Sequence, residues 1–249
     1  MAFTVYEHPL NEKVRLLMRL ELIFNQIEDC KDVSNINNVQ PFFKFLFDCV
    51  EVLERNDIRP TLSYYLDELE RNMLRWASHP EIHDESLQVK LKEAVSLQAE
   101  LANMNKACQK LKEDKFLASL RQRFGIAGGT CDFDLPQLHF WARKPVYQRK
   151  ADVEGWLEVI APLKQALDFS LLFLRESAPF IKKIAENAFY QDNCDESVSL
   201  LRVEYDASRG IFPTISGSKH RYSITFMEPD CAYVKKAVDD NIEFKLATC

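Results

Sequence analysis

The spacing of the hydrophobic residues changes along this 249-residue chain, and that change limits the possible folds more than any other feature. Up to about residue 187, apolar residues such as Val14 and Leu17 recur every three or four positions, as on the buried side of an amphipathic helix. From residue 188 onward, short segments such as 201–205 and 222–226 alternate apolar and polar residues, which is typical of strands with one buried face. The sequence therefore predicts helices first and strands afterwards, an α+β fold.

This pattern predicts a mainly α-helical domain over residues 8–187 and an antiparallel β domain over residues 188–249. The alternating segment 3–7 predicts an N-terminal strand that joins the sheet, so residues 1–7 are assigned to the β domain. Residues 130–133 are a further candidate strand. The strands are expected to form one meander with a solvated face.

Three features of the helical part lead to specific expectations. Two separate helices are predicted over 145–158 and 162–176. One long helix is predicted over 87–112, with a near-heptad apolar seam that suits packing either within the chain or against a second copy. Asn11 is the expected N-cap of a helix that runs to about Glu28.

Composition and motifs argue against several classes of function. The formal net charge of −6 disfavours nucleic acid and anionic membranes as partners. Seven scattered cysteines without a C-x-x-C pair indicate reduced thiols in the cytoplasm, and the N-terminus has no apolar segment typical of a signal peptide. No nucleophile elbow, zinc-protease motif or phosphate-binding loop is present.

The sequence gives little support for a catalytic or metal-binding site. Cys131 and His139 are a conceivable nucleophile and base, but Cys131 is expected in an extended, buried position. His79 and His83 are separated by Pro80 and have no third ligand nearby, so they are expected to be surface histidines. We therefore expect no enzyme activity, no metal and no cofactor.

The segment 113–145 combines a basic helix, a glycine turn and a second helix. Gly128 and Gly129 predict a turn with positive φ, and Asp134 is the expected N-cap before Pro136. His139 and Arg143 are four residues apart and share a helix face. Cations on both sides of a sharp turn indicate an anion-binding surface. Basic residues gather in five places along the chain: Arg15 and Arg19, Arg55 and Arg59, Lys115 with Arg121 and Arg123, His139 and Arg143, and Lys219 with Arg221.

Five segments together resemble the ZapD family of bacterial cell-division proteins. They are YEHPLNEKVR near the start, RQRFGIAGGTCDFDLPQLHFW in the middle, SAPF at 177–180, FYQDN at 189–193 and ISGSKHRY at 215–222. The resemblance runs nearly the whole length in the same order. It implies an α-helical domain joined to a β domain, a homodimer, and no enzyme activity. It also implies binding to the C-terminal tail of the division GTPase FtsZ, bundling of FtsZ filaments, and location at the cytoplasmic mid-cell ring.

The same resemblance implies a basic pocket for the FtsZ tail. The residues carried over by their motifs are Arg19, Arg55, Lys115, His139 and Arg221. Secondary candidates from the basic clusters are Arg15, Arg59, Arg121, Arg123 and Arg143. The alternative is an accessory protein that binds nucleic acid or another anion through the same basic cleft, which the net charge of −6 disfavours.

Overall fold

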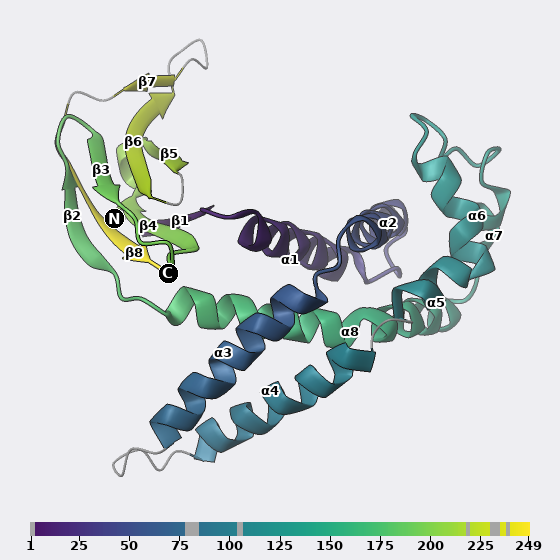
Figure 1. The fold of residues 1–249 in the computed structure, drawn as a ribbon. Coiled ribbons are helices and arrows are strands. Elements are labelled where there is room, and N and C mark those ends of the chain that lie inside the picture. The colour runs from purple at the N-terminus through teal and green to yellow at the C-terminus, as the bar shows by residue number, and fades with distance from the viewer. Residues whose placement is uncertain (1–2, 78–84, 104–106, 218–219, 230–234, 238–239) are drawn as a thin grey trace. The chain divides into compact units, whose positions relative to one another are not determined.

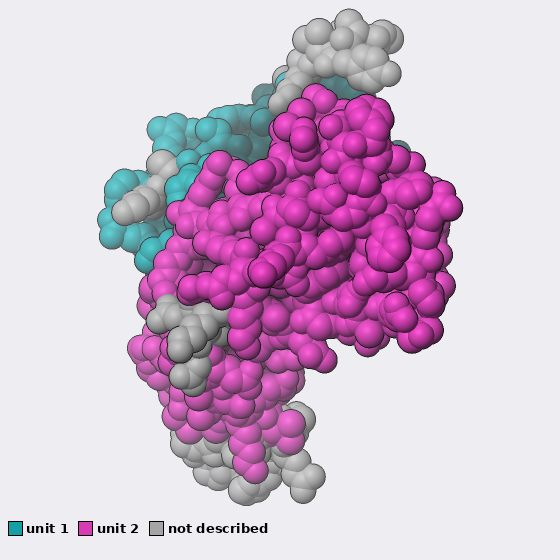
Figure 2. Space-filling model, turned by 90° about the vertical axis from the view of Figure 1, so that its right-hand side faces the viewer, with its two compact units in different colours: residues 1–16, 171–249 teal, residues 17–170 magenta. Residues whose placement is uncertain are grey.

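The chain divides into two compact units, each of which is described separately. The computed structural model describes residues 3–77, 85–103, 107–217, 220–229, 235–237 and 240–249. One unit comprises residues 1–16 and 171–249, and the other comprises residues 17–170 (Figure 2). The first unit contains the strands and the second is helical, so the predicted α+β class is confirmed.

The helical unit is built from helices that the apolar spacing largely predicted (Figure 1). They are α1 (Glu12–Cys30, from residue 17 onward), η1 (Ile36–Asn38), α2 (Val39–Arg55), α3 (Arg59–Ala77), α4 (Glu85–Asn103), α5 (Ala107–Glu113), α6 (Lys115–Phe124), α7 (Pro136–Ala142) and α8 (Val146–Glu176, up to residue 170). The backbone N–H of Val14 donates to Asn11 Oδ1 at 2.8 Å, which confirms the predicted cap of α1.

An aromatic cluster forms the centre of this unit and joins α2, α6, α7 and α8. Phe43 of α2 is fully buried, and its ring centroid lies 5.1 Å from that of Trp141 and 5.5 Å from that of Trp156. The remaining rings of the cluster are those of Phe42, Phe47, Phe116 and Phe124. Edge-to-face contacts of this kind add to the burial energy. The cluster therefore holds α6 and α7 in place on α2.

Both indoles of the cluster are hydrogen-bonded, that of the buried Trp141 and that of the half-buried Trp156. Trp141 Nε1 donates to Asp152 at 2.7 Å, and Trp156 Nε1 donates to Asp114 at 3.1 Å. Because a buried N–H without an acceptor costs free energy, these two carboxylates make the aromatic packing specific.

Helices α3 and α4 lie side by side (Figure 1). The predicted helix over 87–112 is divided into α4 and α5, with residues 104–106 outside the described part of the chain. Ala94, Leu97 and Leu101 of α4 are buried, and the side-chain amide of Gln98 donates to Asp67 of α3. The seam of α4 therefore packs within the chain.

Helix α8 differs from the prediction of two helices. It continues from Val146 to Glu176 with Pro162 inside it. Proline removes one intrahelical hydrogen bond and disfavours a helix interior. Ile160 and Leu163 on either side are both buried, so packing of the apolar stripe keeps the segment helical despite the proline.

The described residues of the β unit form two antiparallel four-stranded sheets instead of the single meander that we expected. The strands are β1 (Phe3–Pro9), β2 (Ile181–Ala185), β3 (Phe189–Asn193), β4 (Leu200–Asp206), β5 (Phe212–Gly217), β6 (Arg221–Pro229), β7 (Lys235–Ala237) and β8 (Ile242–Thr248). One sheet has the order β1-β4-β8-β2, and in the other β3, β6 and β5 are neighbours while β7 pairs with β6. The N-terminal strand pairs with β4, as predicted.

The two sheets share one hydrophobic core, to which buried residues of both contribute. It includes Val203 and Leu246 of the first sheet and Ile224 and Phe226 of the second. Because side chains alternate between the two faces of a strand, both sheets turn one apolar face to the same core. This common core is why the strands form two layers and not one solvated sheet.

Two predicted boundaries differ from the observed elements. Residues 130–133 form turns within the helical unit and are not a strand. Strand β2 lies inside the region that was predicted to be helical. It was not predicted as a strand because its sequence, IKKIA, does not alternate apolar and polar residues. The domain limits 8–187 and 188–249 stay a prediction, whereas the compact units meet at residues 16/17 and 170/171.

A charged cluster fastens three elements of the β unit. Glu7 of β1 accepts hydrogen bonds from Arg175 Nη2 at 2.7 Å, at the end of α8, and from Arg202 Nε of β4 at 2.9 Å. Arg202 Nη1 also donates to the backbone oxygen of Arg175 at 2.7 Å. The three side chains are mostly buried, so each charge depends on the others for compensation.

Candidate partner-binding site

Helix α6 brings three of the predicted cations into the helical unit. Asp114 caps its N-terminus, because Asp114 Oδ1 accepts the backbone N–H of Leu117 at 2.9 Å. Lys115 therefore begins the helix and is exposed, whereas Arg121 and Arg123 lie in its last turn. Lys115 has no ion pair among the described residues.

The glycine turn after α6 has the predicted positive φ at Gly128 but not at Gly129. Gly128 has φ of +73°, which favours glycine. A Cβ atom at Gly129 would lie 2.5 Å from the backbone oxygen of Arg123, so that position also requires a close backbone approach. The predicted cap of α7 is displaced by one residue: Leu135 is the N-cap, Asp134 makes no capping bond, and Pro136 is the first helical residue.

His139 and Arg143 lie together at a cavity of about 430 Å³, as their spacing predicted. The apolar part of the cavity lining is formed by Ile36, Val39, Leu135, Leu138 and Ala142, and the remaining lining residues are Gln40, Thr130 and Asp132. His139 Nδ1 lies 2.9 Å from Asp132 Oδ2, whereas Arg143 is exposed and has no ion pair among the described residues. The cavity therefore combines an apolar lining with one paired and one unpaired basic side chain.

Arg121 forms an ion pair with a carboxylate of another helix. Its two terminal nitrogens donate to Glu54 of α2 at 2.6 and 2.5 Å, and Lys112 Nζ lies 3.2 Å from the same carboxylate. The hydrogen bonds from Arg121 lower the pKa of Glu54 from 4.5 to about 2. Arg121 thus fastens α6 to α2, and its guanidinium is already satisfied by a carboxylate of the chain.

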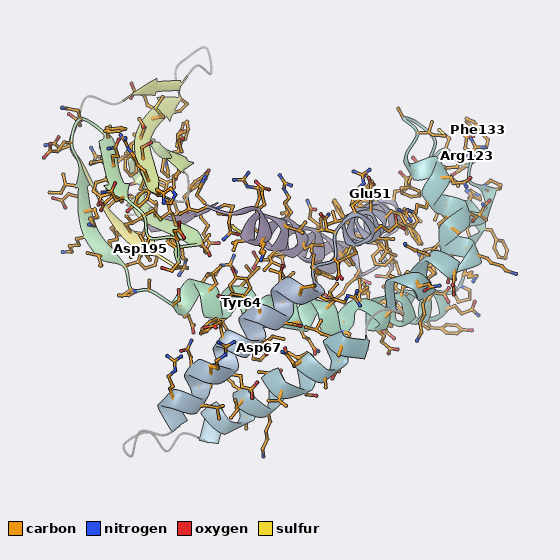
Figure 3. The ribbon with its side chains drawn as sticks, viewed as in Figure 1. Glu51, Tyr64, Asp67, Arg123, Phe133 and Asp195 are labelled. Atoms are coloured by element: carbon orange, nitrogen blue, oxygen red, sulfur yellow. The ribbon has the colours of Figure 1, made fainter. Side chains whose placement is uncertain are left out.

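Other predicted cations also carry acidic neighbours. Arg123, in the last turn of α6, lies 3.6 Å from Asp134. Figure 3 labels Arg123 and, close to it, Phe133. Ion pairs also join Arg55 to Glu51 at 2.6 Å, Arg59 to Asp57 at 2.8 Å and Arg15 to Glu12 at 2.9 Å. Pairs as exposed as these contribute little to stability, so an external carboxylate can compete with the internal one.

Arg19 and Arg221 belong to different units. Arg19 of α1 is exposed and has no ion pair among the described residues. Arg221 begins β6 in the β unit, where its guanidinium donates to Gln191 of β3. The described structure thus brings His139 and Arg143 to one cavity, whose lining includes none of the other candidates.

Cys131 is exposed in the turn between α6 and α7, so the expectation of a buried, extended position was wrong. The glycine turn continues through residue 134 and leaves no room for a strand. His79, His83 and Lys219 lie outside the described residues.

Within the described part of the chain, no three His, Cys, Asp or Glu residues are grouped as metal ligands, and no helix is long and apolar enough to cross a membrane.

Sequence reasoning missed two exposed aromatic residues beside the basic ones. Phe133 is 84% exposed and Phe140 is 70% exposed. A signal was present for Phe140, because Leu138 and Trp141 form the buried stripe of α7 and Phe140 lies off that stripe. Phe133 stands between two aspartates in a turn, where apolar periodicity gives no information.

A protein-family model matches most of the chain. The model is that of ZapD, described as a cell division protein, and it matches residues 18–225. The chain belongs to the ZapD family. Similar proteins named cell division protein ZapD are known from Shewanella oneidensis, with 39% identity over the full length of both chains, and from Cronobacter sakazakii and Vibrio parahaemolyticus, with 37% and 35% identity over 98% of both chains. ZapD is a family of cell division proteins and not an enzyme family, so the chain has a role in cell division.

Proposed function

We propose that this protein binds the C-terminal tail of FtsZ through basic side chains of its helical unit and, as a dimer, crosslinks FtsZ filaments at the division ring. The observation that carries the proposal is the cavity lined by His139 and Arg143, which places two basic groups above an apolar lining. A flexible tail with acidic and apolar residues needs both kinds of surface.

The proposed contacts in the helical unit are Arg19, Arg55, Lys115 and His139. Arg19 and Lys115 are exposed and have no ion pair among the described residues, so a carboxylate of the tail meets no internal competitor there. Arg55 and His139 would exchange Glu51 and Asp132 for carboxylates of the tail. Arg143 lines the same cavity as His139, so it is proposed as a further contact for the tail.

Arg221 belongs to the β unit and is proposed as a contact that must be tested separately. It is exposed at the start of β6, where its guanidinium donates to Gln191 of β3. An effect of Arg221→Gln on tail binding would support this role.

Weak individual contacts are sufficient for such a crosslinker. An exposed ion pair contributes about 0–1 kcal/mol and is screened by salt. Two tail sites in a dimer that faces a filament with many tails raise the effective concentration and thus the avidity. The proposed role requires no catalytic step and places the protein on the cytoplasmic side, at mid-cell.

Binding of a fluorescent FtsZ tail peptide to the full chain tests the proposal. Arg19→Glu and His139→Ala are expected to weaken binding, and increasing salt is expected to weaken the wild type. Lys90→Glu on α4 is a matched control, because Lys90 is an exposed cation outside the proposed contacts. Equal affinity of the wild type, Arg19→Glu and His139→Ala would contradict the assignment of the site, and absence of wild-type binding would contradict the function.

A further inference from the structure

The segment 115–150 differs in charge from the rest of the chain. It contains seven Lys and Arg residues and two Asp residues, in a protein whose formal net charge is −6. The same segment carries exposed apolar side chains at Ile126, Phe133, Phe140 and Tyr147. An exposed surface that is both basic and aromatic fits a partner with carboxylates and apolar groups.

Phe133 is held in place by its neighbours. Asp132 pairs with His139 of α7 at 2.9 Å, and Asp134 lies 3.6 Å from Arg123 of α6. The backbone N–H groups of Asp134 and Leu135 both donate to the oxygen of Cys131, at 2.9 and 3.0 Å, and close a turn around Phe133. The backbone at Phe133 is therefore already ordered, so less conformational freedom is lost when a partner covers the ring.

Phe140 stands beside Arg143, which has no ion pair among the described residues. Residues three apart are neighbours on a helix surface, and Arg143 follows Phe140 by three positions. The backbone N–H of Arg143 donates to the oxygen of Phe140 at 3.1 Å, which confirms that the helical turn is closed there. Lys144 follows by four positions, but its ammonium group lies 3.6 Å from Asp152, so Arg143 is the cation offered beside Phe140.

We infer that Phe133 and Phe140 bind the apolar side chains of the acidic tail peptide, next to the carboxylates that Arg143 holds. This inference rests on the proposed function and names residues that determine its specificity. Charge complementarity selects this occupant: the carboxylates of Asp132 and Asp134 are offset by His139 and Arg123, whereas Arg143 has no ion pair among the described residues. The two rings supply apolar contacts that charge alone cannot supply, and they distinguish this tail from other acidic peptides.

The test compares affinities for a fluorescent peptide of the FtsZ tail at several salt concentrations. Phe133→Ser and Phe140→Ser are each expected to weaken binding about tenfold, which corresponds to about 1.4 kcal/mol. Their salt dependence is expected to equal that of the wild type, because no charge is removed. Arg143→Gln is expected to weaken binding and also to reduce the salt dependence.

Two further variants make the result specific. Leu22→Ser on α1 removes an apolar side chain that is 58% exposed elsewhere on the unit, and it is expected to bind like the wild type. Phe133→Leu retains apolar surface and is expected to recover most of the affinity that Phe133→Ser loses. Both serine variants replace exposed side chains, and their melting temperatures, measured by circular dichroism, are expected to match the wild type.

The outcomes separate the inference from the proposed function. Wild-type binding together with an unchanged affinity of the double variant Phe133→Ser/Phe140→Ser overturns the inference alone. No wild-type binding overturns the proposed function and the inference with it. A loss of affinity in Leu22→Ser equal to that of the phenylalanine variants also overturns the inference, because the effect would then be independent of the surface.

Discussion

The carboxylate of Glu54 accepts hydrogen bonds from both terminal nitrogens of Arg121, at 2.6 and 2.5 Å. The two residues are 67 positions apart and join α2 to α6. Lys115, at the other end of α6, has no ion pair among the described residues. One short helix therefore carries a cation that fastens the fold and a cation that is available to a partner.

Substitutions at the two ends of α6 are expected to have opposite effects. Lys115→Gln removes an exposed charge and is expected to reduce tail binding several-fold with little change in stability. Arg121→Gln breaks the pair with Glu54 and is expected to lower the free energy of unfolding by about 1 kcal/mol with little change in binding. Urea unfolding and peptide binding measured on both variants check this. The reverse pattern would place the partner contact at Arg121.

The Glu54 pair is expected to make stability depend on pH. The pKa of Glu54 is lowered in the folded state from 4.5 to about 2 by Arg121 and Lys112. Because the folded pKa is depressed, the contribution is complete above pH ~4.5 and is lost as the pH falls toward 2. The difference in free energy of unfolding between wild type and Glu54→Gln should therefore be about 1 kcal/mol at pH 7 and should shrink below pH 4.5. A difference that stays constant from pH 7 to pH 3 would contradict this explanation.

Phe43 is expected to be essential to the helical unit. Its fully buried ring contacts rings from α2, α6, α7 and α8. Phe43→Ala removes these contacts and leaves a cavity, so the free energy of unfolding should fall by about 3–5 kcal/mol. Urea unfolding followed by tryptophan fluorescence reports the change, because Trp141 and Trp156 lie in the same cluster. Phe140→Ala on the exposed side of α7 is the control and should change stability by less than about 0.5 kcal/mol.

The charged cluster at Glu7 is expected to stabilise the β unit. Glu7→Gln leaves Arg175 and Arg202 close together without a negative charge between them. We expect a loss of roughly 2–3 kcal/mol, somewhat below the cost of breaking a fully buried pair. Glu204→Gln, which breaks the more exposed pair with Lys245, should cost less than about 1 kcal/mol. Equal losses in the two variants, measured by urea unfolding, would show that burial of the Glu7 cluster has no special effect.

Local sequence patterns predicted most of the elements because they act over a few residues. The cap at Asn11 and the alternation in 222–226 are examples that the structure confirms. Pro162 shows the limit of such rules, since its local cost is exceeded by burial along α8. Strand β2 shows another limit, because an edge strand with exposed side chains carries little alternation.

The candidate site was predictable in part. Spacing alone placed His139 and Arg143 on one face of a helix, and the structure puts both at one cavity. The Arg55–Glu51 pair is also visible in the sequence, as residues four apart on one helix. The Arg121–Glu54 pair depends on how α6 packs on α2, so no local pattern distinguishes Arg121 from Lys115. Which basic residues remain available to a partner therefore depends in part on acidic residues that are distant in the sequence and close in the fold.

Co-sedimentation with FtsZ polymerised by GTP tests the central proposal most directly, with FtsZ that lacks its last few residues run in parallel. The proposal predicts that the protein pellets with full-length filaments and bundles them, and that it stays in the supernatant with the truncated ones. It also predicts that Arg19→Glu and His139→Ala abolish bundling while the protein remains folded. Equal pelleting with both forms of FtsZ, or pelleting with neither, would contradict binding through the tail.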